Sequence, residues 1–301
     1  MTKFIKETLP LHHTASGCRY DLDVWRYSPP RATRTVYLQG GIHGIEITGI
    51  PVLYEFMEVI EQHQLPDRFI CVPQANPMGL DSQMMAVQTG YNNLHTNPQN
   101  CLNWNRITNL GEHAGIEGYW IQQLLRLAEE AEVVLDLHTA GAEALPHVYS
   151  HASQIATVTG LGIPHILSWT GISTSFSDTC FQRGKTATTF ELSASRKVEM
   201  SWVSRSVDYL KRYFGLLPPI EGSRIWIVEK QYKSLYSPFH GVLCWLRETG
   251  DEICQGEPLA FVYSRDGKQT LISPYNGVLL IKYPIHAPYE RQEVAKILVA
   301  E

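Results

Sequence analysis

The sequence lacks the features that mark membrane proteins and nucleic-acid-binding proteins. Its 301 residues carry 25 basic and 30 acidic side chains, a formal net charge of -5, with no block of lysine and arginine. A basic patch for nucleic acid or for an anionic membrane is therefore not expected. No apolar run approaches the ~20 residues that cross a membrane. These absences favour a small molecule or a short peptide as the partner.

The cysteines lack the spacing of a disulfide framework and form no C-x-x-C pair. The six are Cys18, Cys71, Cys101, Cys180, Cys244 and Cys254. A chain of this length does not need disulfides, so we expect reduced and mostly buried thiols. We also expect no signal peptide at the N-terminus, because Glu7 and His12-His13 interrupt it before a long apolar region forms. We therefore expect a cytoplasmic protein.

The length of the chain and a stretch rich in glycine and proline indicate two domains. A single core tends to stop growing near ~250 to 300 residues, and this chain has 301 residues of which 44% are hydrophobic. Gly215-Leu216-Leu217-Pro218-Pro219, followed by Gly222, is typical of a boundary. We predict a catalytic domain over residues 1–220 and a smaller domain over residues 221–301.

The first part alternates apolar strand patterns with helical periodicity. Strands are expected at residues 17–27, 34–38, 68–72, 132–138 and 185–192, and helices at 47–60, 118–131 and 203–214. This alternation predicts an α/β fold with a mixed, mostly parallel sheet flanked by helices. Residues 78–113 have little periodicity, and a long irregular segment in a compact domain is usually functional or disordered, so we expect an active-site wall there.

After the boundary, short strands and turns predominate, and no helix is convincing. Ser237-Pro238-Phe239-His240-Gly241-Val242-Leu243 recurs as Ser273-Pro274-Tyr275-Asn276-Gly277-Val278-Leu279. Two related halves predict a small all-β domain. The turn spacing of Thr249 to Glu252 and Gln255 to Leu259 resembles that of a biotinyl/lipoyl-like barrel-sandwich. Lys268 lies in a turn such as carrier domains use for prosthetic attachment, but its flanks lack the carrier pattern. A solvated hairpin lysine is the favoured interpretation.

The stretch Gln39-Gly40-Gly41-Ile42-His43-Gly44-Ile45-Glu46 follows a β-branched run and opens an apolar-periodic segment. His43 and Glu46 are three residues apart, so both side chains converge if Glu46 lies in the first helical turn. Imidazole nitrogen and carboxylate oxygen are both zinc ligands. An isolated H-x-x-E is weak, because a histidine and a glutamate that merely solvate a helix start would look the same.

Two later strands end in groups of the same kind. Asp136-Leu137-His138 closes one apolar run, and Glu191 closes another. Ligands bind at the carboxyl ends of strands in open α/β sheets, so these side chains are well placed. The alternatives are a satisfied core histidine for His138 and a solvated surface glutamate for Glu191. Asp136 either orients a ligand or forms an ordinary buried ion pair.

The order of these motifs resembles that of a known family. The matching residues are Gly41 to Glu46, Asn76-Pro77, Asn105-Arg106, Asp136 to His138 and Phe190-Glu191-Leu192. They resemble the succinylglutamate desuccinylase/aspartoacylase branch of the zinc carboxypeptidase clan. The C-terminal sandwich is similar too, so the resemblance covers nearly the whole chain.

The resemblance implies one Zn²⁺ per chain, with His43, Glu46 and His138 as its ligands. Two histidines and a carboxylate leave a fourth position for water, as a catalytic zinc site requires. Zinc lowers the pKa of such a water to about 7. Glu191 matches the general base, which would take a proton from this water and deliver it to the departing amine.

The same resemblance implies a carboxylate site at Asn105-Arg106, where a guanidinium fork binds bidentately. Tyr289 lies in a tail where aspartoacylases carry a substrate-contacting tyrosine. The family also places an arginine between the Asn-Pro and Asn-Arg pairs to polarise the scissile carbonyl, and this chain has none there. Arg183, eight residues before Glu191, is a candidate substitute. The alternatives to substrate binding are a helix-capping or surface role for Arg106, a surface position for Tyr289 and a loop charge for Arg183.

The expected reaction is zinc-dependent hydrolysis of an amide beside a free carboxylate. An N-acyl amino acid, as for a deacylase, is the favoured substrate, and the C-terminal bond of a short peptide, as for a metallocarboxypeptidase, is the alternative. A non-catalytic metal-binding homologue is a third hypothesis. A serine esterase is not expected, because no G-x-S-x-G is present. Asn103-Trp104 replaces the acidic-leucine lead-in familiar before the Asn-Arg pair.

Overall fold

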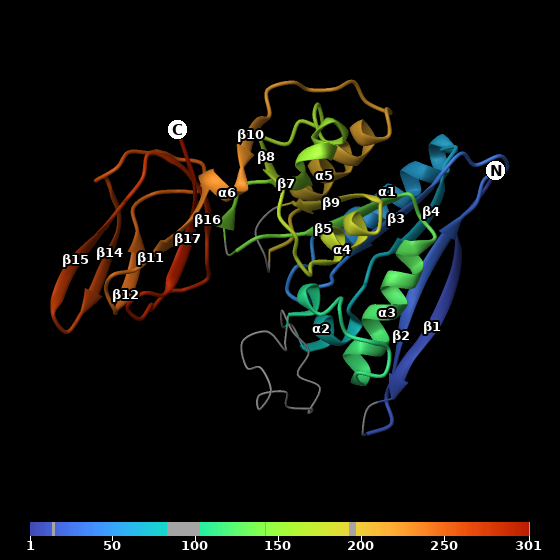
Figure 1. The fold of residues 1–301 in the computed structure, drawn as a ribbon, viewed down its shortest axis with the longest axis horizontal. Coiled ribbons are helices and arrows are strands. Elements are labelled where there is room, and N and C mark those ends of the chain that lie inside the picture. The colour runs from blue at the N-terminus through green and yellow to red at the C-terminus, as the bar shows by residue number, and fades with distance from the viewer. Residues whose placement is uncertain (14–15, 83–102, 142, 193–196, 301) are drawn as a thin grey trace.

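The computed structural model describes residues 1–13, 16–82, 103–141, 143–192 and 197–300. Figure 1 shows a large mixed α/β part and a C-terminal part built of strands. Most of the irregular segment predicted to form an active-site wall, residues 83–102, lies outside the described residues, and so does Cys101.

A nine-stranded mixed sheet organises the first part, in the order β1-β2-β4-β3-β5-β9-β7-β8-β10. Its strands are β1 Ile5–His13, β2 Arg19–Tyr27, β3 Thr35–Gly40, β4 Arg68–Val72, β5 Val133–His138, β7 His147–His151, β8 His165–Trp169, β9 Thr186–Glu191 and β10 Arg224–Ile227. Strands β4, β3, β5 and β9 are mutually parallel, whereas β2 and β7 join them antiparallel. The predicted fold class is therefore confirmed.

Helices cover both faces of this sheet. The helices are α1 Gly49–His63, α2 Pro77–Ser82, α3 Gly115–Glu129, α4 Phe176–Gln182 and α5 Met200–Tyr213, with 3₁₀ turns at Trp104–Arg106 (η2) and Ala152–Thr157 (η3). The predicted helices at 47–60, 118–131 and 203–214 correspond to α1, α3 and α5 within three residues at each end. Strands β1, β7 and β8 and helix α4 were not predicted.

Strand β3 is buried along its whole length. Each of its residues is buried, because alternate side chains face helices on opposite sides of the sheet. Val36 and Leu38 pack in one core with residues of α1 and α5. Tyr37 packs in the other core with residues of α3 and α4. Burial on both faces leaves the strand ends as the place where polar side chains can meet.

The C-terminal part contains a five-stranded and a three-stranded sheet. Its elements are α6 Val228–Gln231, β11 Tyr232–Tyr236, β12 Val242–Trp245, β13 Glu252–Ile253, β14 Pro258–Ser264, β15 Gly267–Ile272, β16 Gly277–Lys282 and β17 Glu293–Val299, and β6 Glu143–Ala144 of the first part pairs with β16. The sequence repeat has a structural counterpart. The Ser237 hydroxyl donates to the Phe239 carbonyl at 2.7 Å, and Ser273 donates to Tyr275 at the same distance.

The domain boundary at residues 220 and 221 stays a prediction, but the pairing of strands corrects one detail. Strand β10 pairs in parallel with β8, so the large sheet extends to Ile227. The loop after β5 also joins the C-terminal part, because the buried ammonium of Lys282 pairs with Glu143 and lies 2.8 Å from Glu248. The two parts therefore share backbone pairing and an ion-pair network.

Cys71, Cys180, Cys244 and Cys254 are free thiols. Cys71 and Cys180 are buried, but Cys18, Cys244 and Cys254 are exposed, so the expectation of mostly buried thiols is wrong. The exposed cysteines lie in the β1–β2 turn and in or next to strands of the small C-terminal sheets, where fewer positions are buried. Among the described residues, no helix combines the length and the apolar character needed to cross a membrane.

Two buried histidines lie side by side where β7 pairs with β8. Burial lowers the pKa of His147 to about 4 and that of His165 to about 4. The Nδ1 of His147 donates to the Leu145 carbonyl at 2.8 Å, and the indole of Trp226 donates to Nδ1 of His165 at 3.1 Å. Both bonds suit neutral imidazoles, so protonation opposes the fold here.

We expect acid to destabilise the protein through these histidines. In the unfolded chain a histidine has a pKa of about 6.5, so the unfolded state binds more protons between about pH 6.5 and 4. The stabilisation is complete above about pH 6.5 and is lost as the pH falls, by up to roughly 3 kcal/mol for His147. Urea unfolding at about pH 7 and 5 measures this. His147→Gln should reduce the difference between the two pH values, and an unchanged difference would contradict the assignment.

Candidate active site

The turn after β3 brings His43 and Glu46 together because glycines allow close backbone contact. A Cβ on Gly44 would lie 1.9 Å from the Gly79 carbonyl oxygen, so a larger residue would push the two segments apart. The backbone N–H of Glu46 donates to the His43 carbonyl at 3.0 Å. Helix α1 begins only at Gly49, so Glu46 lies in this turn. From the sequence we considered Glu46 in the first helical turn, and that placement is wrong.

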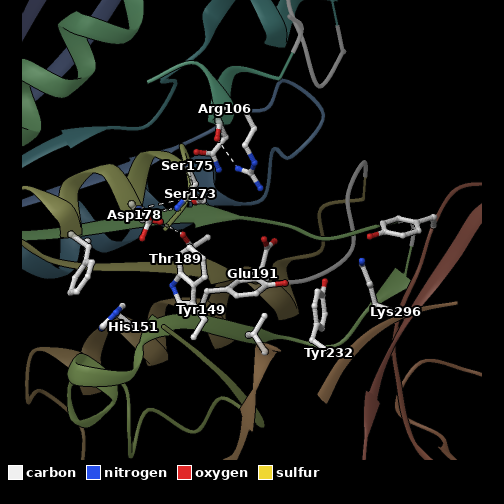
Figure 2. A pocket seen from close by; sticks show the side chains of 17 residues that line it. Arg106, Tyr149, His151, Ser173, Ser175, Asp178, Thr189, Glu191, Tyr232 and Lys296 are labelled. Carbon is white, nitrogen blue, oxygen red and sulfur yellow. Dashed lines mark hydrogen bonds between the residues drawn. The ribbon is translucent and has the colours of Figure 1, made fainter. Parts of the chain in front are cut away.

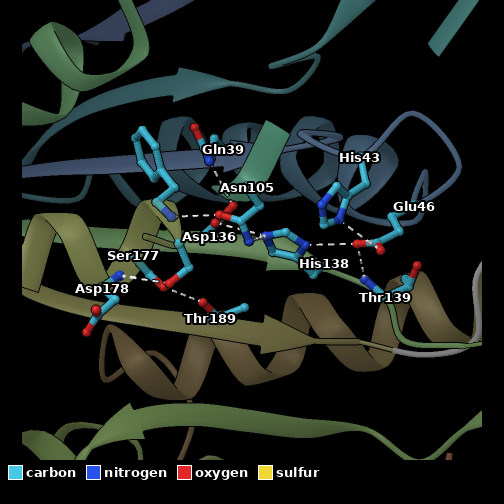
Figure 3. Close-up of polar contacts among 12 residues, drawn as sticks. Gln39, His43, Glu46, Asn105, Asp136, His138, Thr139, Ser177, Asp178 and Thr189 are labelled. Atoms are coloured by element: carbon cyan, nitrogen blue, oxygen red, sulfur yellow. Dashed lines mark hydrogen bonds and ion pairs between the residues drawn. The ribbon is translucent and has the colours of Figure 1, made fainter. Parts of the chain in front are cut away.

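Three buried side chains converge where β3 and β5 end, as Figure 3 shows. Nδ1 of His43 lies 3.0 Å from Oε1 of Glu46, and Nδ1 of His138 lies 2.8 Å from Oε2. One ligand atom from each residue lies within 4.8 Å of the others. The structure thus assembles the three predicted metal ligands into a single group.

A neighbouring amide determines which nitrogen of His43 carries a proton. The side-chain oxygen of Asn103 accepts the backbone N–H of Asn105 at 2.9 Å, which identifies it as the oxygen. The same oxygen lies 2.9 Å from Nε2 of His43. Because an oxygen acceptor needs a donor, Nε2 carries the proton, and the lone pair of Nδ1 faces Glu46.

A carboxylate plays the equivalent part for His138. Nε2 of His138 lies 2.9 Å from Oδ2 of Asp136, so the proton is on Nε2 and Nδ1 again faces Glu46. The other oxygen of Asp136 accepts from the Gln39 amide at 2.9 Å, and Tyr37 donates to the Gln39 oxygen at 2.8 Å. Asp136 therefore orients His138, one of the two roles that the sequence left open for it.

This arrangement suits a bound cation. With Nε2 of each histidine directed at its outer partner, the two Nδ1 atoms, once deprotonated, and the Glu46 carboxylate give three donor atoms that can bind one cation. The electrostatics agree, because positive charge is favoured at this point. Burial opposes the charged form of Glu46, yet His43 and His138 lower its pKa to about 2. Burial likewise opposes the charged form of His138, but Asp136 and Glu46 raise its pKa well above the usual value.

Glu191 ends β9 directly beside the end of β5, where its pairing partner is His138. Burial raises the pKa of Glu191 to about 8, and the negative charges of Glu46 and Asp136 add to this, while His138 and Arg106 oppose it. Within the described part of the chain, its Oε2 has no hydrogen-bond partner. A carboxyl group that is buried, unpartnered and open to either protonation state can both accept and donate a proton.

A cavity of about 440 Å³ adjoins Glu191 and is walled by both parts of the chain (Figure 2). The residues that line it include Asn105, Arg106, Glu191, Tyr149, Tyr232, Tyr283 and Lys296. Arg106 donates from one guanidinium nitrogen to the Asn105 carbonyl at 2.7 Å. No carboxylate of the described residues forms an ion pair with it, so the rest of its fork can bind an anionic ligand.

Asn105 faces the same cavity, but the protein itself uses its side-chain amide. Its oxygen accepts the backbone N–H of Phe176 at 2.6 Å, at the start of α4. Its nitrogen lies 3.5 Å from Nε2 of His138. Asn105 therefore links the start of α4 to the metal-ligand group, and its predicted role in substrate binding stays a prediction.

The structure does not bring the two remaining predicted substrate contacts to this cavity. Arg183 is 40% exposed at its side chain and lies 3.9 Å from Glu129, next to α4. Tyr289 is 67% exposed, on the loop before β17. Neither is among the described residues that line the cavity. Their predicted roles have no support from this geometry.

The sequence analysis missed the aromatic and cationic residues that the cavity does contain. Tyr149, Tyr232, Tyr283 and Lys296 come from β7, β11, the end of β16 and β17. No motif marks them, since they meet only through the packing of the two parts. The one available signal was the alternation within β7, where buried Val148 and Ser150 flank Tyr149.

Comparisons with known proteins identify the family and the fold. The succinylglutamate desuccinylase/aspartoacylase catalytic domain model matches residues 32–213, more than half of the chain. A family protein from Shewanella amazonensis SB2B is 19% identical with a TM-score of 0.83, over 98% of each chain. A succinylglutamate desuccinylase/aspartoacylase from Rhodobacter sphaeroides is 17% identical with a TM-score of 0.83, over 100% of this chain and 95% of the other.

A third structure is the product-bound ectoine utilization protein EutE (DoeB) from Ruegeria pomeroyi. It is 17% identical with a TM-score of 0.79, over 100% of this chain and 95% of the other. These likenesses show a shared fold that includes the C-terminal strands. A search among curated proteins gives no match. The match of the catalytic-domain model, over residues that include His43, Glu46, His138 and Glu191, shows that the chain belongs to the succinylglutamate desuccinylase/aspartoacylase family.

Proposed function

We propose that the protein is a zinc-dependent amidohydrolase that cleaves the amide of an N-acyl amino acid beside its free carboxylate. The observation that carries this proposal is the cavity lined by Glu191 and Arg106, in which Glu191 is the strand partner of His138, a member of the group of His43, Glu46 and His138. Such a site pairs a general base with an anion-binding fork and a metal-ligand set.

The metal would be held by His43, Glu46 and His138. Two imidazole nitrogens and a carboxylate oxygen are the donor types of catalytic zinc sites, which keep a position free for water or substrate. A zinc ion bound there supplies Lewis-acid activation of water and of the scissile carbonyl. Asp136 and Asn103 hold the imidazoles in the protonation states that binding requires.

The chain's own residues then supply binding and proton transfer. Arg106 binds the free carboxylate of the substrate and so places the adjacent amide beside Glu191. Glu191 takes a proton from the attacking water while the oxygen of that water bonds to the amide carbon. When the carbon–nitrogen bond breaks, the same proton passes to the leaving nitrogen, and the products are a carboxylic acid and an amine.

The family description favours deacylation, because its members are named as a desuccinylase and an aspartoacylase. EutE (DoeB), a similar fold, is named for ectoine utilization. Hydrolysis of the C-terminal bond of a short peptide remains the alternative, since it also places an amide beside a free carboxylate. A cytoplasmic location stays a prediction.

We expect hydrolysis of one or more N-acyl amino acids in a panel that also contains short peptides. Glu191→Gln should lower kcat by roughly 10²- to 10⁴-fold, because the amide cannot accept the proton. Glu129→Gln, at an exposed side chain away from the cavity, is the matched control and should keep full activity. Unchanged hydrolysis by Glu191→Gln would refute the mechanism. Hydrolysis of neither class by the zinc-loaded protein would refute the function and favour a non-catalytic homologue.

Removal of metal should abolish hydrolysis, and zinc should restore it. Zinc that binds only the folded state should also stabilise it, by about 2.7 kcal/mol at a free concentration 100 times the dissociation constant. Thermal unfolding of chelator-treated protein, with and without zinc, measures this. If His43→Ala responds to zinc as strongly as the parent protein does, the ion binds elsewhere.

Arg106→Lys should raise KM by roughly 10- to 100-fold with a smaller change in kcat, because an ammonium cannot form the bidentate bond of a guanidinium. Blocking the substrate carboxylate as an amide should cause a similar loss in the parent protein. Arg183→Lys provides the matched comparison. The geometry predicts no change for it, and a raised KM would restore the role that the sequence suggested for Arg183.

A further inference from the structure

One side-chain oxygen holds two parts of the site at once. Oδ1 of Asn103 accepts from Nε2 of His43 at 2.9 Å and from the backbone N–H of Asn105 at 2.9 Å. The first bond orients a metal-ligand candidate on the turn after β3. The second caps the 3₁₀ turn Trp104–Arg106, which begins directly after Asn103.

That 3₁₀ turn carries Arg106 and orients its side chain toward the cavity. The backbone N–H of Arg106 donates to the Asn103 carbonyl at 2.9 Å, and the guanidinium of Arg106 donates to the Asn105 carbonyl at 2.7 Å. Asn103 therefore bonds to this short segment through both its side chain and its backbone. A displacement of Asn103 would move the anion-binding fork and His43 together.

The two histidines are held by chemically different groups. His138 donates to the carboxylate of Asp136, whereas His43 donates to the neutral amide of Asn103. The neutral group has a physical reason, because Glu46, Asp136 and Glu191 already place three carboxyl groups here. Their mutual repulsion contributes to the raised pKa of Glu191. An amide orients His43 without adding a fourth negative charge.

We propose that Asn103 is a positioning residue that couples the metal site to the carboxylate-binding site through this shared oxygen. The inference rests on the proposed function, since it takes His43 as a metal ligand and Arg106 as the substrate anchor. Asn103 belongs neither to the group of three candidate ligands nor to the described residues that line the cavity. It holds Nδ1 of His43 and the guanidinium of Arg106 in a fixed relation.

The test compares the full-length protein with Asn103→Ala, Asn103→Asp and Asp136→Asn. Zinc affinity is measured by competition between the chelator-treated protein and a chromophoric chelator. The KM for the best N-acyl amino acid of the panel is measured on the zinc-loaded enzymes. Asn103→Ala should weaken zinc binding by about 10- to 100-fold, as loss of such a supporting partner typically does. It should also raise KM by about tenfold, because the turn that carries Arg106 loses its cap.

The conservative variants separate this coupling from a merely structural role. A carboxylate oxygen accepts both hydrogen bonds, and bound Zn²⁺ compensates the negative charge that it adds, so Asn103→Asp should keep zinc affinity and KM within about threefold of the parent. Asp136→Asn should weaken zinc binding but leave KM within about twofold, because Asp136 forms no hydrogen bond with the turn. If Asn103→Ala does not fold, Asn103→Asp decides, since loss of both properties there would contradict the proposal.

Each outcome has a distinct meaning. Parent-like zinc affinity in Asn103→Ala would overturn the role of Asn103 and leave the proposed function intact. Weakened zinc binding with an unchanged KM would overturn the coupling to Arg106. Absence of zinc binding in the parent protein would refute the proposed function, and this inference with it.

Discussion

The structure depends on a carboxylate placed between two imidazoles in a buried pocket. Glu46 is 6% exposed and lies within 3.0 Å of both His43 and His138. A buried carboxylate requires compensating positive charge or donors, and here the backbone N–H of Thr139, at 3.3 Å, and the two imidazoles face it. The favourable state is one in which a cation shares this space. The glycine turn, the outer hydrogen bonds to Asp136 and Asn103, and the strand ends all serve to hold this group together.

The topology explains how distant segments meet there. Strands β3, β5 and β9 are adjacent and parallel, so their carboxyl ends lie at one edge of the sheet. His43 follows β3, His138 ends β5 and Glu191 ends β9. Each strand is buried along most of its length, so a polar side chain that is to reach a ligand lies at or beyond the strand's end. Neighbouring strands, and not sequence proximity, create the site.

Local spacing and strand pattern marked His43, Glu46, His138 and Glu191 as candidates, because each follows or ends an apolar run, and the resemblance to the family supplied their expected roles. They were not enough for Tyr149, Tyr232 or Lys296, which reach the cavity from elements that no motif marks. The same limit applies to β10, which follows the predicted boundary but pairs with β8 of the large sheet. A turn-rich stretch does not reveal which sheet the next strand joins. A substrate-binding role for Arg183 was inferred from its separation from Glu191 along the chain. Arg183 follows α4, and its side chain does not line the cavity.

The charges of the cavity narrow what it can recognise under the proposed function. Among the described residues that line it, the permanent cations are Arg106 and Lys296. The ammonium of Lys296 lies 2.6 Å from the Glu293 carboxylate and donates to Ser234 at 2.7 Å, so its positive charge is largely neutralised within the protein. Arg106 alone retains a free fork, which suits one carboxylate. The remaining wall, with the hydroxyls of Tyr149, Tyr232 and Tyr283, suits a neutral acyl group better than a second anion.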